Sequence, residues 1–176
     1  PETLVFHLQR FETDYMMDPP QTKKINSRFV IPQTLDMTKY TLEGRTMDED
    51  NKPLPHPDEY YQFELHGITI HTGTANGGHY YSYARERGSY PANWMCFNDE
   101  KVKKWSVDNL ERDCFGGETE RNGRKYQNMA NAFMVFYERK KKIVSKDGKS
   151  GSSREVSHNG ANVTLDEESK SSDSLG

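Results

Sequence analysis

A histidine that directly follows two glycines is the residue of this sequence best placed to do chemistry. His79 ends the run Gly77-Gly78-His79 and opens a tyrosine-rich stretch that begins at Tyr80. Glycines adopt backbone angles closed to other residues and project no side chain, so an extended peptide could pass close to the imidazole. We predict a substrate-binding edge formed by Asn76, Gly77, Gly78 and Tyr80. A lone histidine beside glycines is more often structural, so a catalytic role for His79 needs further support.

A second short stretch supplies a group that could orient this histidine. The aromatic run that starts at Trp94 ends in Asn98 and Asp99. An amide or carboxylate oxygen can accept a hydrogen bond from the far ring nitrogen of a histidine and fix its tautomer, as the third member of a catalytic triad does. Asp99 could equally be a turn residue that caps the end of the strand. We predict Asn98 and Asp99 as orienting residues, with Asp99 at least as important as Asn98.

Neither cysteine of the sequence has the surroundings of a nucleophile. Cys96 lies between two large apolar residues of an expected strand, and Cys114 precedes glycines at the end of an expected helix. An activated thiolate usually needs a helix N-terminus or an adjacent cation. We therefore predict that both are packing residues. A metal site built from Cys96 with His66, His71 and His79 follows neither a helical nor a hairpin spacing of ligands, so no metal or cofactor is expected.

Hydrophobic patterning predicts a mostly β structure that positions these residues. Leu4 to Gln9 reads as a strand covered on both faces, Ile25 to Ile31 as a strand, and Ala132 to Tyr137 as a central strand. Between Tyr61 and Ile70 the alternating apolar residues switch from one face of the expected strand to the other near Gly67. A β-bulge there would return them to a common buried face. Because nothing in the sequence could cover the first strand, we expect the chain to be the C-terminal half of a larger domain.

The remaining segments are predicted as connections. Tyr15 to Lys24 and Glu118 to Met129 read as loops, and Glu43 to Asp58 as a mobile insertion. His71 to Gly78 reads as a hairpin loop, so that the return strand starts at His79. Ser106 is a plausible N-cap for a short helix that ends near Gly116.

Composition limits the class of protein. The 176 residues fit one domain, and a net charge of −3 with a pI near 6.1 argues against nucleic acid as a partner. No segment has the roughly 20 apolar residues of a membrane span, so no membrane partner is expected. Two cysteines without a CxxC pair favour a cytosolic or nuclear setting. We predict a folded domain over residues 1–140 and a disordered polar tail over residues 141–176.

Five segments, in order, resemble the catalytic domain of the ubiquitin-specific proteases, which are papain-like thiol deubiquitinases. The resemblance runs from about Pro1 to Arg139, and the stretch from Cys114 to Glu118 looks most like the very large members of the family. The segments are Leu4 to Phe11, Lys24 to Asp36, Tyr61 to His79, Trp94 to Val102 and Asn131 to Tyr137.

The resemblance implies an α+β, papain-like fold with an antiparallel β-sheet and short helices. It implies hydrolysis of the peptide or isopeptide bond after the C-terminal glycine of ubiquitin, with His79 as the base and Asn98 and Asp99 as its orienting residues. The loop from Tyr15 to Lys24 would lean over the ubiquitin tail. The partners implied are ubiquitin, ubiquitinated proteins and the N-terminal half of the same domain, which would carry the cysteine nucleophile. The alternative is a catalytically inactive ubiquitin-binding or scaffold fragment.

Overall fold

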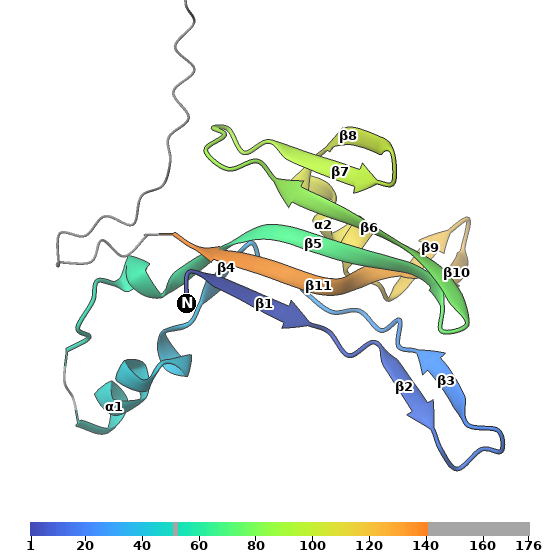
Figure 1. Ribbon diagram of the computed structural model, residues 1–176, viewed down its shortest axis with the longest axis horizontal. Coiled ribbons are helices and arrows are strands. Elements are labelled where there is room, and N and C mark those ends of the chain that lie inside the picture. The colour runs from blue at the N-terminus through green and yellow to red at the C-terminus, as the bar shows by residue number, and fades with distance from the viewer. Residues whose placement is uncertain (51–52, 141–176) are drawn as a thin grey trace, which may run out of the picture. The chain divides into compact units, whose positions relative to one another are not determined.

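A computed structural model describes residues 1–50 and 53–140, so the predicted tail lies outside the described residues. Seven antiparallel strands form the main sheet in the order β1-β11-β5-β6-β7-β8, and β4 pairs with the start of β5 (Figure 1). No helix of the described residues is long and apolar enough to cross a membrane. The strands of this sheet are β1 (Thr3–His7), β4 (Thr34–Asp36), β5 (Gln62–Thr74), β6 (Gly77–Arg85), β7 (Trp94–Asn98), β8 (Lys101–Trp105) and β11 (Ala130–Arg139).

Two small hairpins and short helices complete the described chain. One hairpin joins β2 (Phe11–Asp14) to β3 (Gln21–Lys24), and the other joins β9 (Glu118–Arg121) to β10 (Arg124–Gln127). The α-helices are α1 (Leu42–Asp50) and α2 (Leu110–Cys114). Single turns of 3₁₀ helix lie at Thr38–Tyr40, Asp58–Tyr61 and Val107–Asn109. This content fits the predicted α+β class, with an antiparallel sheet and few helical residues.

The predicted bulge in β5 is confirmed and explains how one strand keeps a single buried face. Phe136 of β11 pairs with Gly67, whereas the next residue, Tyr137, pairs with Leu65, so His66 is an extra residue in the ladder. Side chains on both sides of this irregularity point into the core, and Leu65 and Ile68 are 2% and 1% exposed. The extra residue therefore keeps the apolar residues before and after it on the same buried face of the strand.

The core lies on one face of the sheet and is closed by α2. Leu110 and Cys114 of α2 and the following Phe115 are buried against residues of β5, β6 and β11. Ser106 begins this helical segment as predicted, because its Oγ accepts a hydrogen bond from the Asp108 amide at 3.3 Å. In Figure 1, α2 lies behind the sheet, so the opposite face is turned toward the viewer.

Two predicted strands differ from the structure. In the described part of the chain, β1 is an edge strand that pairs with β11 alone. Val5 and Phe6 are exposed, whereas the sequence predicted cover on both faces. Residues 25–31 form no strand. Instead, Arg10 donates hydrogen bonds to the carbonyl oxygens of Ile25 and Ser27, at 3.0 and 2.6 Å. These side-chain hydrogen bonds take the place of those that a neighbouring strand would make.

The predicted loops contain more regular structure than expected. Glu118 to Met129 is mostly the β9–β10 hairpin, and its Asn122-Gly123 turn has positive φ at both residues, as a tight hairpin turn requires. Gln21–Lys24 is a strand, and Leu42–Asp50 within the predicted insertion is helical. Residues 51–52 of that insertion lie outside the described part of the chain.

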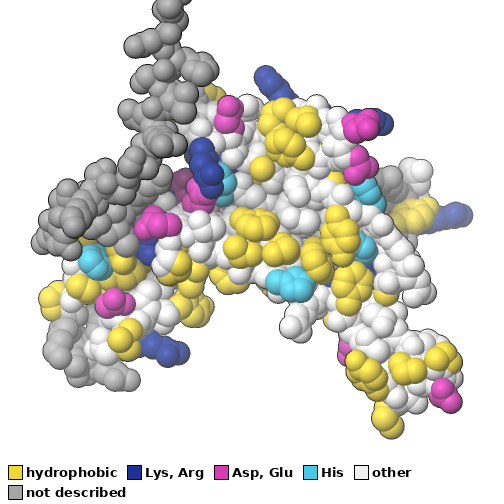
Figure 2. Space-filling view, in the orientation of Figure 1, with side chains coloured by type: hydrophobic (Ala, Val, Ile, Leu, Met, Phe, Trp, Pro, Cys, Tyr) yellow, Lys and Arg dark blue, Asp and Glu magenta, His cyan; other side chains and the backbone are white. Residues whose placement is uncertain are grey.

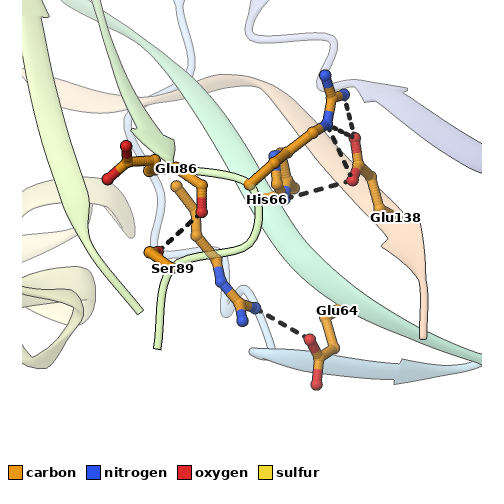
Figure 3. A network of polar contacts seen from close by, with 7 residues as sticks. Glu64, His66, Glu86, Ser89 and Glu138 are labelled. Atoms are coloured by element: carbon orange, nitrogen blue, oxygen red, sulfur yellow. Dashed lines mark hydrogen bonds and ion pairs between the residues drawn. The ribbon is translucent and has the colours of Figure 1, made fainter. Parts of the chain in front are cut away.

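A polar network surrounds His66, Glu64 and Glu138 (Figure 3). His66 Nδ1 lies 3.5 Å from a carboxylate oxygen of Glu138, and the Arg87 guanidinium donates to the same carboxylate. Arg85 donates to Glu64 at 2.9 Å. These contacts join β5, β11 and the loop after β6. Because burial lowers the pKa of His66, its contact with Glu138 at neutral pH is a weak one to an uncharged ring.

Candidate active site

His79 and Asn98 come together at one end of the β6–β7 pair. The ladder between these strands joins Ser82–Arg85 to Trp94–Phe97, and His79 lies just beyond it on β6. Asn98, the last residue of β7, places its Oδ1 2.7 Å from His79 Nε2. An amide oxygen only accepts hydrogen bonds, so Nε2 carries the proton and Nδ1 keeps the lone pair that a base needs.

Asp99 is a more distant neighbour of the same ring. Its Oδ2 lies 3.7 Å from His79 Nε2, and its side chain is 75% exposed. The residue has a φ of 51°, which places it in the tight turn between β7 and β8. The structure therefore brings both predicted orienting residues to His79, but only Asn98 lies within hydrogen-bond distance. The backbone geometry also agrees with the alternative reading of Asp99 as a turn residue.

The imidazole of His79 is accessible and leans on an aromatic neighbour. Its side chain is 43% exposed, and its ring lies nearly parallel to that of Tyr81, with centroids 6.3 Å apart. Tyr81 points to the same side of β6 because side chains two residues apart share a face. The ring is thus held on two sides while Nδ1 remains free to meet a substrate or a nucleophile.

The two glycines before His79 are required for different reasons. The hairpin is tighter than predicted, since β6 begins at Gly77 and only Ala75 and exposed Asn76 form the turn. A Cβ at Gly77 would meet no atom of residues 1–50 and 53–140 within 4 Å. A Cβ at Gly78 would lie 2.3 Å from His71 Nε2 and 2.4 Å from the Thr72 carbonyl oxygen. Gly78 is therefore explained by packing inside the hairpin, whereas Gly77 borders open space.

Tyr80 lies on the opposite face of β6 from His79. Its ring contacts His71 and Phe133, with centroids 4.7 and 5.3 Å apart, and the side chain remains 47% exposed. It is therefore available to a ligand that runs over that face of the hairpin. Its predicted role in substrate binding remains a prediction.

The surroundings of both cysteines agree with the packing role that the sequence predicted. Cys96 is 3% exposed, Cys114 is 0% exposed, and both are free thiols. Burial raises the pKa of both thiols, which is the opposite of what a nucleophile needs. Among the described residues, no group of three or more histidine, cysteine or acidic side chains is arranged to hold a metal ion.

Sequence reasoning missed two polar residues beneath the hairpin, the buried His71 and the partly buried Lys24. His71 is 4% exposed, and its Nδ1 has no hydrogen-bond partner among the described residues. Lys24 donates to backbone carbonyls at the end of β5. Lys24 could have been noticed as a lysine beside the apolar Ile25, but no pattern in the sequence indicates which carbonyls it reaches.

Known proteins resemble this chain in sequence over most of its length. The family model described as ubiquitin carboxyl-terminal hydrolase matches residues 1–137. Ubiquitin carboxyl-terminal hydrolase 34 of Mus musculus is 36% identical over 147 residues, which are 77% of this chain and 4% of that protein. Ubiquitin carboxyl-terminal hydrolase puf of Drosophila melanogaster is 30% identical over 181 residues, which are 80% of this chain and 5% of that protein. The chain thus spans a small part of very long relatives, as the resemblance in sequence had indicated.

Solved structures support the same assignment. The SAGA DUB module containing Ubp8, Sgf11, Sus1 and Sgf73, bound to monoubiquitin, matches with a TM-score of 0.51 and 25% identity. The match covers 78% of this chain and 23% of that one. The chain belongs to the ubiquitin carboxyl-terminal hydrolase family, and its antiparallel sheet with short helices is part of the papain-like fold of the ubiquitin-specific proteases.

Proposed function

We propose that this chain supplies the histidine base and its orienting residue to a thiol deubiquitinase. The substrate is ubiquitin joined through its C-terminal glycine to an amine, and the reaction is hydrolysis of that peptide or isopeptide bond. The observation that carries the proposal is the 2.7 Å contact between His79 Nε2 and Asn98 Oδ1, in a chain of this family. It leaves Nδ1 of an accessible imidazole as the proton acceptor.

His79 takes part in both halves of the reaction. A cysteine from the preceding half of the domain gives its proton to His79 Nδ1, and the thiolate attacks the carbonyl carbon of the ubiquitin glycine. The imidazolium then donates the proton to the leaving amine, which departs as the acyl-enzyme forms. Water attacks the thioester after giving a proton to His79, and the cysteine leaves as the free carboxylate of ubiquitin is released. Asn98 holds the ring in one tautomer throughout.

An exposed apolar face of the sheet supports ubiquitin as a partner. By strand register, Val5, Tyr80, Phe97 and Val102 lie on the face opposite the core, and each is close to half exposed. Figure 2 shows hydrophobic side chains spread across this side of the sheet. Such a surface suits a protein partner rather than solvent.

A second exposed apolar region supports the N-terminal half of the domain as a partner of this chain. Phe29 and Val30 are about half exposed. They line a hollow of about 120 Å³ together with Phe6, Leu8 and Val135. The residues that line this hollow carry no charge, which suits packing against apolar side chains from another part of the same domain. Packing there would cover the strand that the sequence predicted to be buried on both faces.

The alternative is a ubiquitin-binding or scaffold module without activity. The burial of Cys96 and Cys114 favours it for the chain alone, because neither thiol can act as a nucleophile. Hydrolysis of ubiquitin with a fluorescent C-terminal amide by the full-length protein separates the two functions. We expect turnover that His79→Ala abolishes while ubiquitin binding persists. Binding without turnover in the unmodified protein would leave only the scaffold function.

A further inference from the structure

The ammonium of Lys24 is bound by three backbone carbonyls beneath the β5–β6 hairpin. Lys24 is the last residue of β3, and its Nζ lies 2.6 Å from the carbonyl oxygen of Met129 and 2.9 Å from that of His71. A third oxygen, that of Gly73, lies 3.4 Å away. One side chain therefore links β3, the end of β5 and the residue before β11.

These carbonyls lie where the main sheet loses a strand. β11 begins at Ala130, opposite Thr72, so the last residues of β5 extend beyond its ladder. Backbone carbonyls that lack a ladder partner need another donor. The three N–H groups of Lys24 provide donors at the end of this ladder. The hairpin that continues from Gly73 is thus anchored by a side chain rather than by a neighbouring strand.

Placing an ammonium here costs free energy. Burial, together with the positive charge of Arg10, lowers the pKa of Lys24 to about 8. The charged and titratable groups that act on it are Arg10 and His71, and neither brings a negative charge. An apolar side chain would avoid this cost, so a contribution to overall stability does not explain why a lysine stands here. The hydrogen bonds that Lys24 directs at three carbonyl oxygens do explain it.

The anchored residues lie directly beside the candidate base. Thr72 pairs with His79 across the hairpin, and the ring of His71 fills the space that a side chain at Gly78 would need. A shift of the His71 and Gly73 carbonyls would therefore move the strand start that carries His79. We propose that Lys24 is a positioning residue that fixes the hairpin over residues 72–79 and, through it, the imidazole of His79. The catalytic consequence rests on the proposed function.

Hydrogen–deuterium exchange of the full-length protein tests the structural part of this inference. We expect Lys24→Met to lower the protection of amides in residues 72–79 roughly tenfold to a hundredfold, the range for hydrogen bonds to a charged group. Lys24→Arg, which keeps the charge and the donors, should restore most of that protection. Lys23→Met is the matched control, since exposed Lys23 pairs with Glu12 at 3.2 Å and should leave the hairpin unchanged.

The result that overturns the inference is equally specific. Unchanged protection in Lys24→Met, or an equal loss throughout the main sheet, would show that Lys24 does not position the hairpin. Hydrolysis of fluorescent ubiquitin amide adds a second measurement, in which Lys24→Met should lower kcat about tenfold or more with a smaller change in KM. If the unmodified protein has no turnover, the proposed function fails, and the exchange measurement alone decides the role of Lys24.

Discussion

His79 donates its Nε2 proton to the side-chain oxygen of Asn98 across 2.7 Å. An amide fixes the tautomer of the ring but brings no charge to stabilise an imidazolium, in contrast to the aspartate of a serine-protease triad. This arrangement suffices where the resting state already pairs a thiolate with an imidazolium, because the sulfur supplies the negative charge. The contact therefore favours a cysteine nucleophile over a serine.

Removing the Asn98 amide should slow turnover without abolishing it. We expect Asn98→Ala to lower kcat by about 10-fold to 100-fold, at the low end of what an acid–base group contributes, because the ring then samples both tautomers and other orientations. Asn98→Asp should retain most of the rate. Hydrolysis of fluorescent ubiquitin amide by the full-length protein measures both variants.

Asp99→Ala serves as the comparison for Asn98. Its carboxylate lies 3.7 Å from His79 and is 75% exposed, so we expect a loss of less than about tenfold. This order is the reverse of the one expected from the sequence. A normal rate for Asn98→Ala with a collapse for Asp99→Ala would make the carboxylate the orienting residue.

The glycines of the hairpin should respond differently to the same substitution. Gly78→Ala would place a methyl group 2.3 Å from His71 and should destabilise the protein by about 1–3 kcal/mol, as overpacking does. Gly77→Ala meets no atom within 4 Å and should unfold at nearly the wild-type denaturant concentration. Urea titration compares them, and equal stability of the two variants would contradict the close packing of Gly78 on His71.

The two cysteines should be inert in the folded protein. A ubiquitin probe with a thiol-reactive C-terminus should leave Cys96 and Cys114 unmodified, since both are buried and burial raises the pKa of each thiol. In urea, iodoacetamide should label both, which provides the positive control. Peptide mass spectrometry reads the result, and specific capture of either cysteine by the probe would show that this chain carries its own nucleophile.

Stability should fall in acid through His71. Burial, and secondarily the charge of Lys24, lowers the pKa of His71 below its usual value of 6.5. Between that value and the lowered one, the unfolded chain binds a proton that the folded chain does not, so the free energy of unfolding falls as the pH drops through this window. His71→Phe should flatten this dependence in urea titrations at pH 5 to 7.

The same coupling gives a second measurement. Lys24→Met removes a positive charge near the imidazole and should move the pKa of His71 upward, as read from the ring signals in NMR titration. An unchanged pKa of His71 would mean that the two side chains do not interact electrostatically.

The sequence predicted what depends on local order. Alternation of apolar residues predicted β5 and its bulge, and the short aromatic run that starts at Trp94 predicted β7. His79 and Asn98 could be paired because His79 begins one expected strand, Asn98 ends another, and both lie in segments that resemble a known family. These features need only the spacing of residue types along the chain.

What the sequence did not predict depends on contacts between distant segments. Residues 25–31 look like a strand, but Arg10 takes the place of a ladder partner there. The hairpin at Asn122-Gly123 carries a turn dipeptide typical of hairpins, but its flanking residues are polar, so hydrophobic patterning does not predict its two strands. Lys24 reads as one of several lysines until the three carbonyls it binds are known.

The bulge at His66 also means that the two ends of β5 differ in how well they tolerate the deletion of a residue. Loss of that one residue would convert the irregular ladder to a regular one and leave the buried faces on either side as they are. Between Ile68 and Thr72 the extra residue is Phe133 of β11, so loss of a residue from β5 there would widen the mismatch and turn Thr72, the partner of His79, to the wrong face. Changes of chain length are therefore tolerable on one side of the strand and damaging a few residues away.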